Sequence, residues 1–125
     1  MRLLIVDDSA AWRQRLAAMF SPVEGIEVVS QAQDAPEALA LVRALRPEMV
    51  ILDIQMPGGG GIDVLREVKR DYPKTVVVML TSHPEPPYRQ RCAELGADYF
   101  LSKSTGSQLL IEIGEQLAAA AGTTR

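Results

Sequence analysis

The chain has 125 residues, a length that accommodates one domain with a single hydrophobic core. Hydrophobic residues make up 47% of it and charged residues 23%, close to the globular average, so a disordered chain or a fibrous repeat is excluded. The 13 Lys and Arg residues against 16 Asp and Glu residues give a net charge of −3, which argues against direct nucleic-acid binding by phosphate neutralisation.

Short apolar runs alternate with longer amphipathic patterns along the whole chain. Strands are predicted at residues 2–7, 27–32, 49–53, 75–81 and 97–102. Each is followed by apolar residues three or four positions apart, the spacing of one helix face: Trp12/Leu16/Phe20, Leu39/Val42/Leu45, Ile62/Leu65/Val68/Tyr72, Tyr88/Cys92/Leu95 and Leu109/Ile113/Leu117. This alternation predicts an α/β fold with a doubly wound parallel sheet buried on both faces.

Helix boundaries are marked by proline and by capping residues. Asp34, Pro36 and Glu37 form the pattern of an N-cap, a first-turn proline and a capping-box acid before the second helix. Three prolines lie between positions 84 and 87, and proline disfavours helical backbone at the residue before it. We therefore expect residues 84–87 to form a loop and the fourth helix to begin near Tyr88.

The cysteine content and the short apolar runs bear on localisation. Cys92 is the single cysteine, so the fold needs no intramolecular disulfide, and we expect Cys92 to be a small core residue. The run Leu3 to Val6 spans four residues and Val76 to Leu80 spans five, both too short for a signal-peptide core or a bilayer span. We expect a cytoplasmic protein without a membrane segment.

Polar residues gather where the predicted strands end, and ligands bind at this edge of a doubly wound sheet. They are Asp7 and Asp8 after the first strand, Asp53 at the third, Thr81 and Ser82 at the fourth, and Lys103 at the fifth. Converging carboxylates need a cation, and all-oxygen ligation favours Mg²⁺ with coordination positions left for phosphate. Lysine and threonine at the same edge would complement phosphoryl oxygens.

Asp53 is the best candidate for a nucleophile in this group, because it ends the central strand. A carboxylate attacks phosphorus to form an aspartyl phosphate when a metal ion and a lysine offset the charge. Taken singly, the residues have simpler interpretations: Asp7 and Asp8 as an acidic pair favoured at a helix N-terminus, and Lys103 as a solvated lysine.

Four motifs, in order and spacing, resemble the receiver domain of bacterial two-component response regulators. They are Leu4-Ile5-Val6-Asp7-Asp8, Val50-Ile51-Leu52-Asp53 followed by Met56-Pro57, Leu80-Thr81-Ser82, and Gly96-Ala97-Asp98-Tyr99-Phe100-Leu101-Ser102-Lys103. The resemblance covers essentially the whole chain, and we expect residues 1–121 to form the receiver domain and 122–125 a C-terminal tail. It implies a flavodoxin-like (βα)5 fold with strand order 2-1-3-4-5, and a signalling phosphoacceptor rather than an enzyme.

The resemblance also implies roles for the site residues. Asp53 would accept a phosphoryl group from a sensor histidine kinase or a histidine phosphotransfer protein, or slowly from small acyl phosphates. Mg²⁺ would be held directly by Asp8, mainly through water by Asp7, and further by Asp53 and the backbone carbonyl of Gln55. Lys103 would pair with the phosphoryl group.

The response to phosphorylation would follow from the same resemblance. Thr81 would move to bind the phosphoryl group and Phe100 would turn inward, which repacks the face of the fourth helix, fifth strand and fifth helix for a partner. Gln55 and His83 would tune the phosphoryl lifetime by setting the access of water, although His83 is equally well interpreted as an exposed loop residue. Ser104 replaces the family's usual proline, so we predict a trans Lys103–Ser104 bond.

Two further features have simple interpretations. Gly58 to Gly61 lack the lysine and hydroxyl of a P-loop and are expected to form a flexible loop before the third helix. Trp12 lies one turn beyond Asp8 and is expected to pack, with fluorescence that could report metal binding.

Alternative functions remain at this point. A Mg²⁺-dependent phosphatase with an aspartate nucleophile would share the chemistry, but Gln55 stands where a second acid is needed. An interaction module that is never phosphorylated would not need the acidic cluster. We expect a stand-alone receiver, or one cut from a longer regulator, that acts on a downstream protein or a separate output domain; phosphorylation-linked homodimerisation is a further hypothesis.

Overall fold

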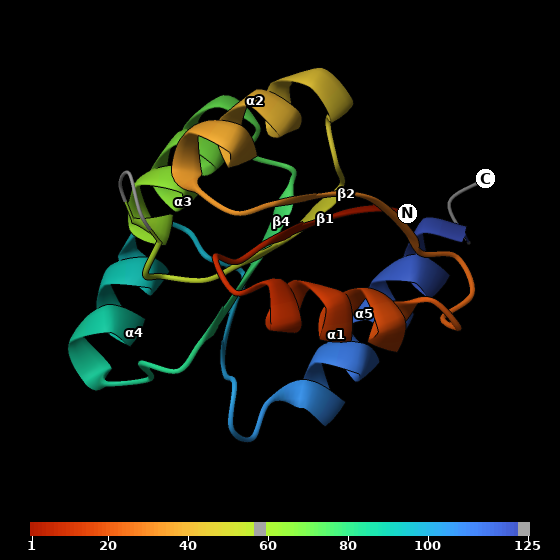
Figure 1. Cartoon of the computed structure of the whole chain (residues 1–125). Coiled ribbons are helices and arrows are strands. Elements are labelled where there is room, and N and C mark those ends of the chain that lie inside the picture. Colours follow the sequence, from red (N-terminus) through yellow and green to blue (C-terminus); the bar gives the residue numbers. More distant parts are fainter. Residues whose placement is uncertain (57–59, 123–125) are drawn as a thin grey trace.

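The computed structural model describes residues 1–56 and 60–122, where strands and helices alternate as predicted (Figure 1). In chain order the elements are β1 (Arg2–Val6), α1 (Ala10–Phe20), β2 (Glu27–Ala32), α2 (Ala35–Leu45), β3 (Met49–Leu52), α3 (Gly61–Asp71), β4 (Val76–Thr81), α4 (Pro86–Glu94), β5 (Tyr99–Ser102) and α5 (Ser107–Gly122). Each strand lies within two residues of its predicted bounds.

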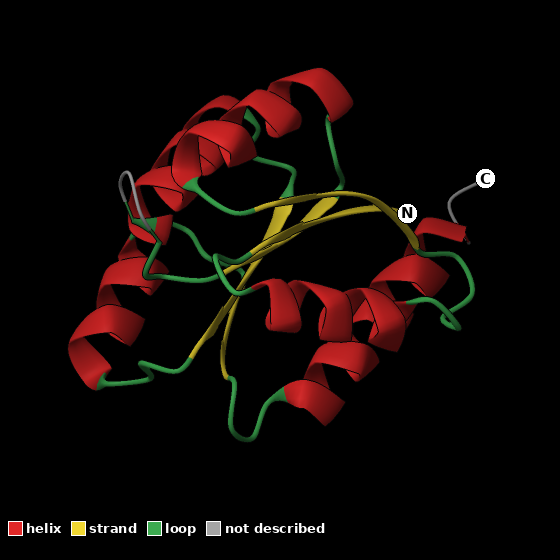
Figure 2. Cartoon of the chain, in the orientation of Figure 1, coloured by secondary structure: helices red, strands yellow, loops and turns green. Residues whose placement is uncertain are grey.

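The strands form one parallel sheet in the order β2-β1-β3-β4-β5, which confirms the predicted flavodoxin-like topology. Figure 2 shows the sheet between two layers of helices, with α1 and α5 on one face and α2, α3 and α4 on the other. The strand order reverses direction between β1 and β3, so the carboxyl ends of these two neighbours form the switch point where such folds bind ligands.

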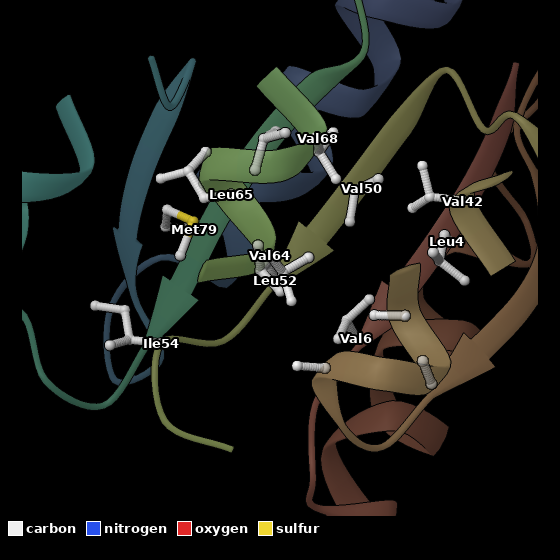
Figure 3. Packing of buried hydrophobic residues seen from close by; sticks show 14 of the residues in the cluster. Leu4, Val6, Val42, Val50, Leu52, Ile54, Val64, Leu65, Val68 and Met79 are labelled. Carbon is white, nitrogen blue, oxygen red and sulfur yellow. The ribbon is translucent and has the colours of Figure 1, made fainter. Parts of the chain in front are cut away.

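Strand side chains alternate between two hydrophobic clusters, one on each face of the sheet, because successive residues of a strand point to opposite faces. Leu4 and Val6 of β1 belong to the cluster under α2 and α3, whereas Leu3 and Ile5 belong to the cluster under α1 and α5. Figure 3 shows the first cluster, in which Val64, Leu65 and Val68 of α3 pack over Val50, Leu52 and Met79. Burial on both faces explains why β1, β3 and β4 read as continuous apolar runs.

The N-cap predicted for α2 is confirmed. Asp34 accepts a hydrogen bond from the Glu37 backbone N–H at 2.9 Å, and Glu37 Oε1 accepts one from the Gln33 N–H at 3.2 Å. Cys92 is fully buried in the core, as expected.

The predicted start of α4 is wrong. The helix begins at Pro86, two residues before Tyr88, with Glu85 at its N-cap. A proline in the first helical turn gives up no intrahelical hydrogen bond, since the backbone N–H groups there have no partner inside the helix. Residues 86 and 87 are therefore helical, not part of the loop.

Within the described ranges, no helix has both the length and the apolar composition needed to cross a membrane.

Candidate functional site

The carboxyl ends of β1 and β3 bring the predicted acidic residues together. Asp7 follows β1 and Asp53 follows β3, and the strands are in register there, with Val6 opposite Leu52. The Asp53 N–H donates to the Val6 carbonyl at 3.1 Å, which continues the pairing past the strand ends. Carboxylate oxygens of Asp7, Asp8 and Asp53 lie within 4.8 Å of one another.

Two of these carboxylates are buried and held in place. Asp7 is 2% exposed and Asp53 is 6% exposed, whereas Asp8 is open to solvent. Asp7 Oδ1 accepts from the Ser9 N–H at 2.9 Å, and Asp53 Oδ1 accepts from the Ile54 N–H at 2.7 Å. One oxygen of each buried carboxylate is thus fixed by backbone, which directs the other toward the centre of the site.

Lys103 reaches this centre from the end of β5. Its Nζ lies 2.7 Å from Asp7 Oδ2 and 3.1 Å from Asp53 Oδ2, and its side chain is 9% exposed. The Lys103 N–H donates to the Thr81 carbonyl at 2.8 Å, which anchors the residue beside β4. One ammonium facing Asp7, Asp8 and Asp53 leaves the site with a formal charge of −2.

Burial acts in opposite directions on the two kinds of group. It raises the pKa of Asp7 above its ordinary value, and this effect outweighs the hydrogen bonds from Lys103 and Ser9 that favour the ionised form. Burial alone would lower the pKa of Lys103, but its contacts with Asp7 and Asp53 raise it overall. The lysine therefore stays protonated beside the acidic cluster.

The residues present fit a divalent cation. All three acidic side chains offer hard oxygen ligands, and two are already fixed in orientation. Mg²⁺ binds such sites through few protein carboxylates and keeps several waters. Gln55 is exposed two residues beyond Asp53, and the role of its carbonyl as a ligand stays a prediction.

The predicted switch residues lie beside the site. Thr81 is fully buried, and its Oγ1 accepts a hydrogen bond from the His83 N–H at 3.0 Å. His83 is partly exposed, with Nδ1 3.9 Å from Glu85 Oε1. Phe100 on β5 is half-buried, and the Arg89 guanidinium of α4 lies 4.6 Å from its ring centroid.

Sequence analysis missed the role of Gly61. This residue is the first of α3, not part of a flexible loop, and its N–H donates to the Ile54 carbonyl at 2.6 Å. A Cβ atom on Gly61 would lie 1.7 Å from the Asp53 carbonyl oxygen, so only glycine allows α3 to begin there. The earlier part of the predicted loop, residues 58 and 59, and Pro57 of the Met56-Pro57 motif lie outside the described residues.

Sequence analysis also missed the contacts between α1 and the site. Ser9 is the N-cap of α1, and its Oγ accepts from the Trp12 N–H at 3.3 Å. Lys103 Nζ lies 4.9 Å from the centroid of the Trp12 ring. Arg13 Nη1 donates to the Asp7 carbonyl at 2.7 Å. A serine three residues before Trp12, the first large apolar residue of α1, is typical of an N-cap, so Ser9 could have been predicted to begin α1 beside the site.

The loop after Lys103 has Ser104 where the family usually has proline, and the serine hydroxyls form hydrogen bonds there. No cis peptide bond occurs in the described residues, so the Lys103–Ser104 bond is trans, as predicted. The Ser102 and Ser104 hydroxyl oxygens lie 2.8 Å apart, and the Ser104 N–H donates to Ser102 Oγ at 3.2 Å.

A comparison with protein families matches residues 3–114 to the response regulator receiver domain. Among curated proteins, the response regulator GacA of Pseudomonas aeruginosa is 33% identical over 119 residues, which are 95% of this chain and 56% of that protein. A protein-glutamate methylesterase/protein-glutamine glutaminase of Bacillus subtilis is 36% identical over 121 residues, 94% of this chain and 34% of that protein. The chain thus spans about half, or a third, of the length of these relatives.

Solved structures show the same similarity. A two-component response regulator of the LuxR family from Aurantimonas sp. SI85-9A1 superposes with a TM-score of 0.87 at 28% sequence identity, covering 95% of this chain and 85% of that one.

Proposed function

The chain belongs to the response regulator receiver domain family, and from this premise we propose that it is a signalling switch phosphorylated on Asp53 in a Mg²⁺-dependent reaction. The observation that carries the proposal is Lys103, whose ammonium contacts the buried Asp7 and Asp53 beside the exposed Asp8. We further propose that residues 1–121 form the receiver and 122–125 its tail, although α5 continues to Gly122.

In the proposed reaction an Asp53 carboxylate oxygen attacks the phosphorus of a phosphohistidine on a sensor kinase or phosphotransfer protein. A P–O bond forms as the P–N bond breaks, and the leaving imidazole keeps the electron pair and takes up a proton. Lys103, protonated and already 3.1 Å from Asp53 Oδ2, needs only a short movement to pair with a phosphoryl oxygen. A small acyl phosphate would react in the same way and leave as its carboxylate.

The metal ion would be held by Asp7, Asp8, Asp53 and the Gln55 carbonyl. Bound Mg²⁺ offsets the negative charge of the transferring phosphoryl group. Asp8 is the exposed member of the cluster and would form its solvent side, while the buried Asp7, fixed by Ser9, would orient the inner water ligands.

The proposed readout uses contacts on two neighbouring strands. Thr81 Oγ1 would leave the His83 N–H and donate to the phosphoryl group. Phe100 would turn inward and leave the Arg89 guanidinium, which changes the surface of α4, β5 and α5. Phosphorylation would then shift the population between two conformers of this face, which a downstream protein, an output domain or a second copy of the chain reads.

The chemistry is tested by incubating the protein with Mg²⁺ and a small acyl phosphate and measuring its intact mass. The expected result is a persistent gain of one phosphoryl group that Asp53→Asn abolishes. Turnover of many phosphate esters without a lasting adduct would instead identify a phosphatase. No adduct with any donor would identify an interaction module that is never phosphorylated.

The lifetime of the phosphoryl group tests Gln55 and His83. Both residues lie two positions beyond a site residue and are at least partly exposed, so they can limit the approach of the hydrolytic water. We expect altered dephosphorylation rates in Gln55→Ala and His83→Ala. Rates equal to that of the wild type in both variants would refute the assignment.

A further inference from the structure

We propose that Trp12 is a positioning residue for phosphoryl transfer: its indole ring keeps the Lys103 ammonium over the site while the charges of the surrounding carboxylates change. The inference rests on the proposed phosphorylation of Asp53. It starts from the distance of 4.9 Å between Lys103 Nζ and the Trp12 ring centroid. Trp12 lies on the first turns of α1 and is half-buried.

Trp12 is one of four residues linked in a ring of contacts, which connects Asp7, a proposed metal ligand, to Lys103, the proposed phosphate ligand. Asp7 Oδ1 accepts from the Ser9 backbone N–H, and Ser9 Oγ accepts from the Trp12 backbone N–H. The Trp12 ring faces Lys103, and Lys103 Nζ returns to Asp7 Oδ2 at 2.7 Å. The backbone of Trp12 is thereby fixed relative to the same aspartate that the lysine pairs with, and the ring lies against the lysine.

In the proposed reaction, the contact of Lys103 with the Trp12 ring does not change when metal binds or when Asp53 is phosphorylated. Asp7 and Asp53 both pair with the lysine, but both are proposed metal ligands and Asp53 becomes esterified to phosphorus. The face of an indole ring coordinates neither Mg²⁺ nor phosphate, so its attraction for the ammonium persists at every stage. Cation–π attraction is strongest when the cation is desolvated, and the Lys103 side chain is only 9% exposed. Without the ring, a flexible four-carbon stem would hold the charge less well.

The chain offers two matched controls. Arg15 also lies against Trp12, with its guanidinium 4.8 Å from the ring centroid, but it is exposed on α1 and has no contact with the carboxylates in the structure. Tyr72, beyond the C-terminal end of α3, has Arg46 4.7 Å from its ring centroid. Arg15→Gln therefore removes a cation from the same ring, and Tyr72→Leu removes a ring from a cation outside the site.

The test compares the initial rate of phosphoryl gain from a small acyl phosphate, followed by intact mass at saturating Mg²⁺. Trp12→Leu is expected to slow it about fivefold, within the range of cation–π strengths, and Trp12→Phe to recover most of the loss. Arg15→Gln and Tyr72→Leu should stay within twofold of the wild type. Mg²⁺ affinity, measured by calorimetry, should change less than twofold in Trp12→Leu, because the carboxylates are retained.

A proton NMR measurement tests the contact directly. The ε-methylene protons of Lys103 should be shifted upfield by the ring current of Trp12, both with and without Mg²⁺, and Trp12→Leu should remove the shift. Loss of this upfield shift on adding Mg²⁺ to the wild type would overturn the proposal.

An unchanged phosphorylation rate in Trp12→Leu would also overturn the proposal. So would a fall in Mg²⁺ affinity equal to the fall in rate, because Trp12 would then stabilise the whole site rather than position Lys103. If Trp12→Leu does not fold, Trp12→Phe with its weaker ring must slow the reaction measurably. A wild type that gains no phosphoryl group refutes the proposed function instead, and the NMR shift still decides whether Trp12 holds Lys103.

Discussion

Two lysines of this chain sit in similar surroundings at opposite ends of the sheet. Lys69, near the end of α3, lies before the amino ends of β4 and β5, and Lys103 lies after the carboxyl end of β5. Both side chains are mostly buried, at 15% and 9% exposure, and both contact aspartate. The two sites differ in the burial of their aspartates, with Asp98 at 36% exposure against 2% for Asp7, and in the balance of charge and partners.

Lys69 is fully matched by its partners. Its Nζ donates to Asp98 Oδ2 at 3.1 Å and to the Pro73 and Thr75 carbonyls at 3.0 and 2.8 Å. Asp98 Oδ2 also accepts from the Val77 N–H at 2.8 Å. One cation meets one anion, and the three ammonium protons each have an acceptor, so the cluster ties α3 to the start of β4 and needs nothing further.

Lys103 brings one positive charge to a cluster of three acidic side chains. It faces two buried carboxylates with Asp8 beside them, so the cluster is charge-balanced only when a further cation binds. Removing one partner of a matched buried pair destabilises the fold, whereas an excess of buried acidic groups around one lysine is typical of a functional site. The following predictions test this distinction.

Replacing each lysine by methionine should give the largest contrast. Lys103→Met removes the cation that we propose to pair with the phosphoryl group, and we expect the rate of phosphoryl gain to fall about 100-fold, the cost of losing one transition-state charge partner. Lys69→Met should leave this rate within twofold and lower the free energy of unfolding by about 2 kcal/mol, because Asp98 loses its ion pair and the Pro73 and Thr75 carbonyls lose a donor. Intact mass and urea denaturation measure the two effects. Equal losses of phosphorylation in both variants would contradict the distinction.

Each site also depends on a glycine, for different physical reasons. A Cβ on Gly61 would lie 1.7 Å from the Asp53 carbonyl oxygen, so Gly61→Ala should lower the free energy of unfolding by about 3 kcal/mol and slow phosphorylation by displacing Asp53.

Gly96 has room for a Cβ, 3.6 Å from the Lys69 side chain, but its φ of +94° is unfavourable for alanine. Gly96→Ala should therefore cost about 1 kcal/mol, the strain of that backbone conformation, without slowing phosphorylation. Thermal unfolding and intact mass measure both variants; a slower reaction in Gly96→Ala would contradict the prediction.

The fold and most of the site could be predicted because both depend on local patterns. Alternating apolar runs define the sheet, and residues directly after parallel strands share an edge wherever the strands lie, which brings Asp7, Asp53 and Lys103 together. Gly61 could not be predicted in this way, since its requirement is set by the close approach of α3 to the Asp53 backbone. The contact of Trp12 with Lys103 likewise depends on how α1 and β5 pack.

The start of α4 was mispredicted for a local reason. Proline restricts the residue before it, but the first turn of a helix accepts proline, so a cluster of prolines fits either a loop or a helix start.

Mg²⁺ should stabilise the site of Lys103 and leave the site of Lys69 unaffected. At a concentration 100 times its dissociation constant, a ligand of the folded state adds about 2.7 kcal/mol to the free energy of unfolding. We expect this gain in the wild type and in Asp98→Asn, and its loss in Asp8→Asn, which removes the exposed member of the proposed ligand set. Trp12, the single tryptophan, should report binding through its fluorescence. Equal stabilisation of Asp8→Asn would place the ion elsewhere.

The smallest expected effect is on the free energy of unfolding, which Asp7→Asn and Asp98→Asn should change in different directions in metal-free buffer. Burial raises the pKa of Asp7, so the folded protein binds the Asp7 proton more tightly than the unfolded chain does. The resulting stability is fully present below the ordinary pKa and is lost as pH rises through the raised value. Near neutral pH without Mg²⁺, Asp7→Asn should therefore be at least as stable as the wild type.

Asp98→Asn, the matched change in the other cluster, should lower the free energy of unfolding by about 1 kcal/mol, because it weakens the pair with Lys69. Adding Mg²⁺ should reverse the order of Asp7→Asn and the wild type, since the ion gains more from the intact acidic cluster. Urea denaturation with and without Mg²⁺ measures these differences. If Asp7→Asn loses as much stability as Asp98→Asn in metal-free buffer, the Lys103 site is a matched structural cluster like that of Lys69, and the charge argument for a cation fails.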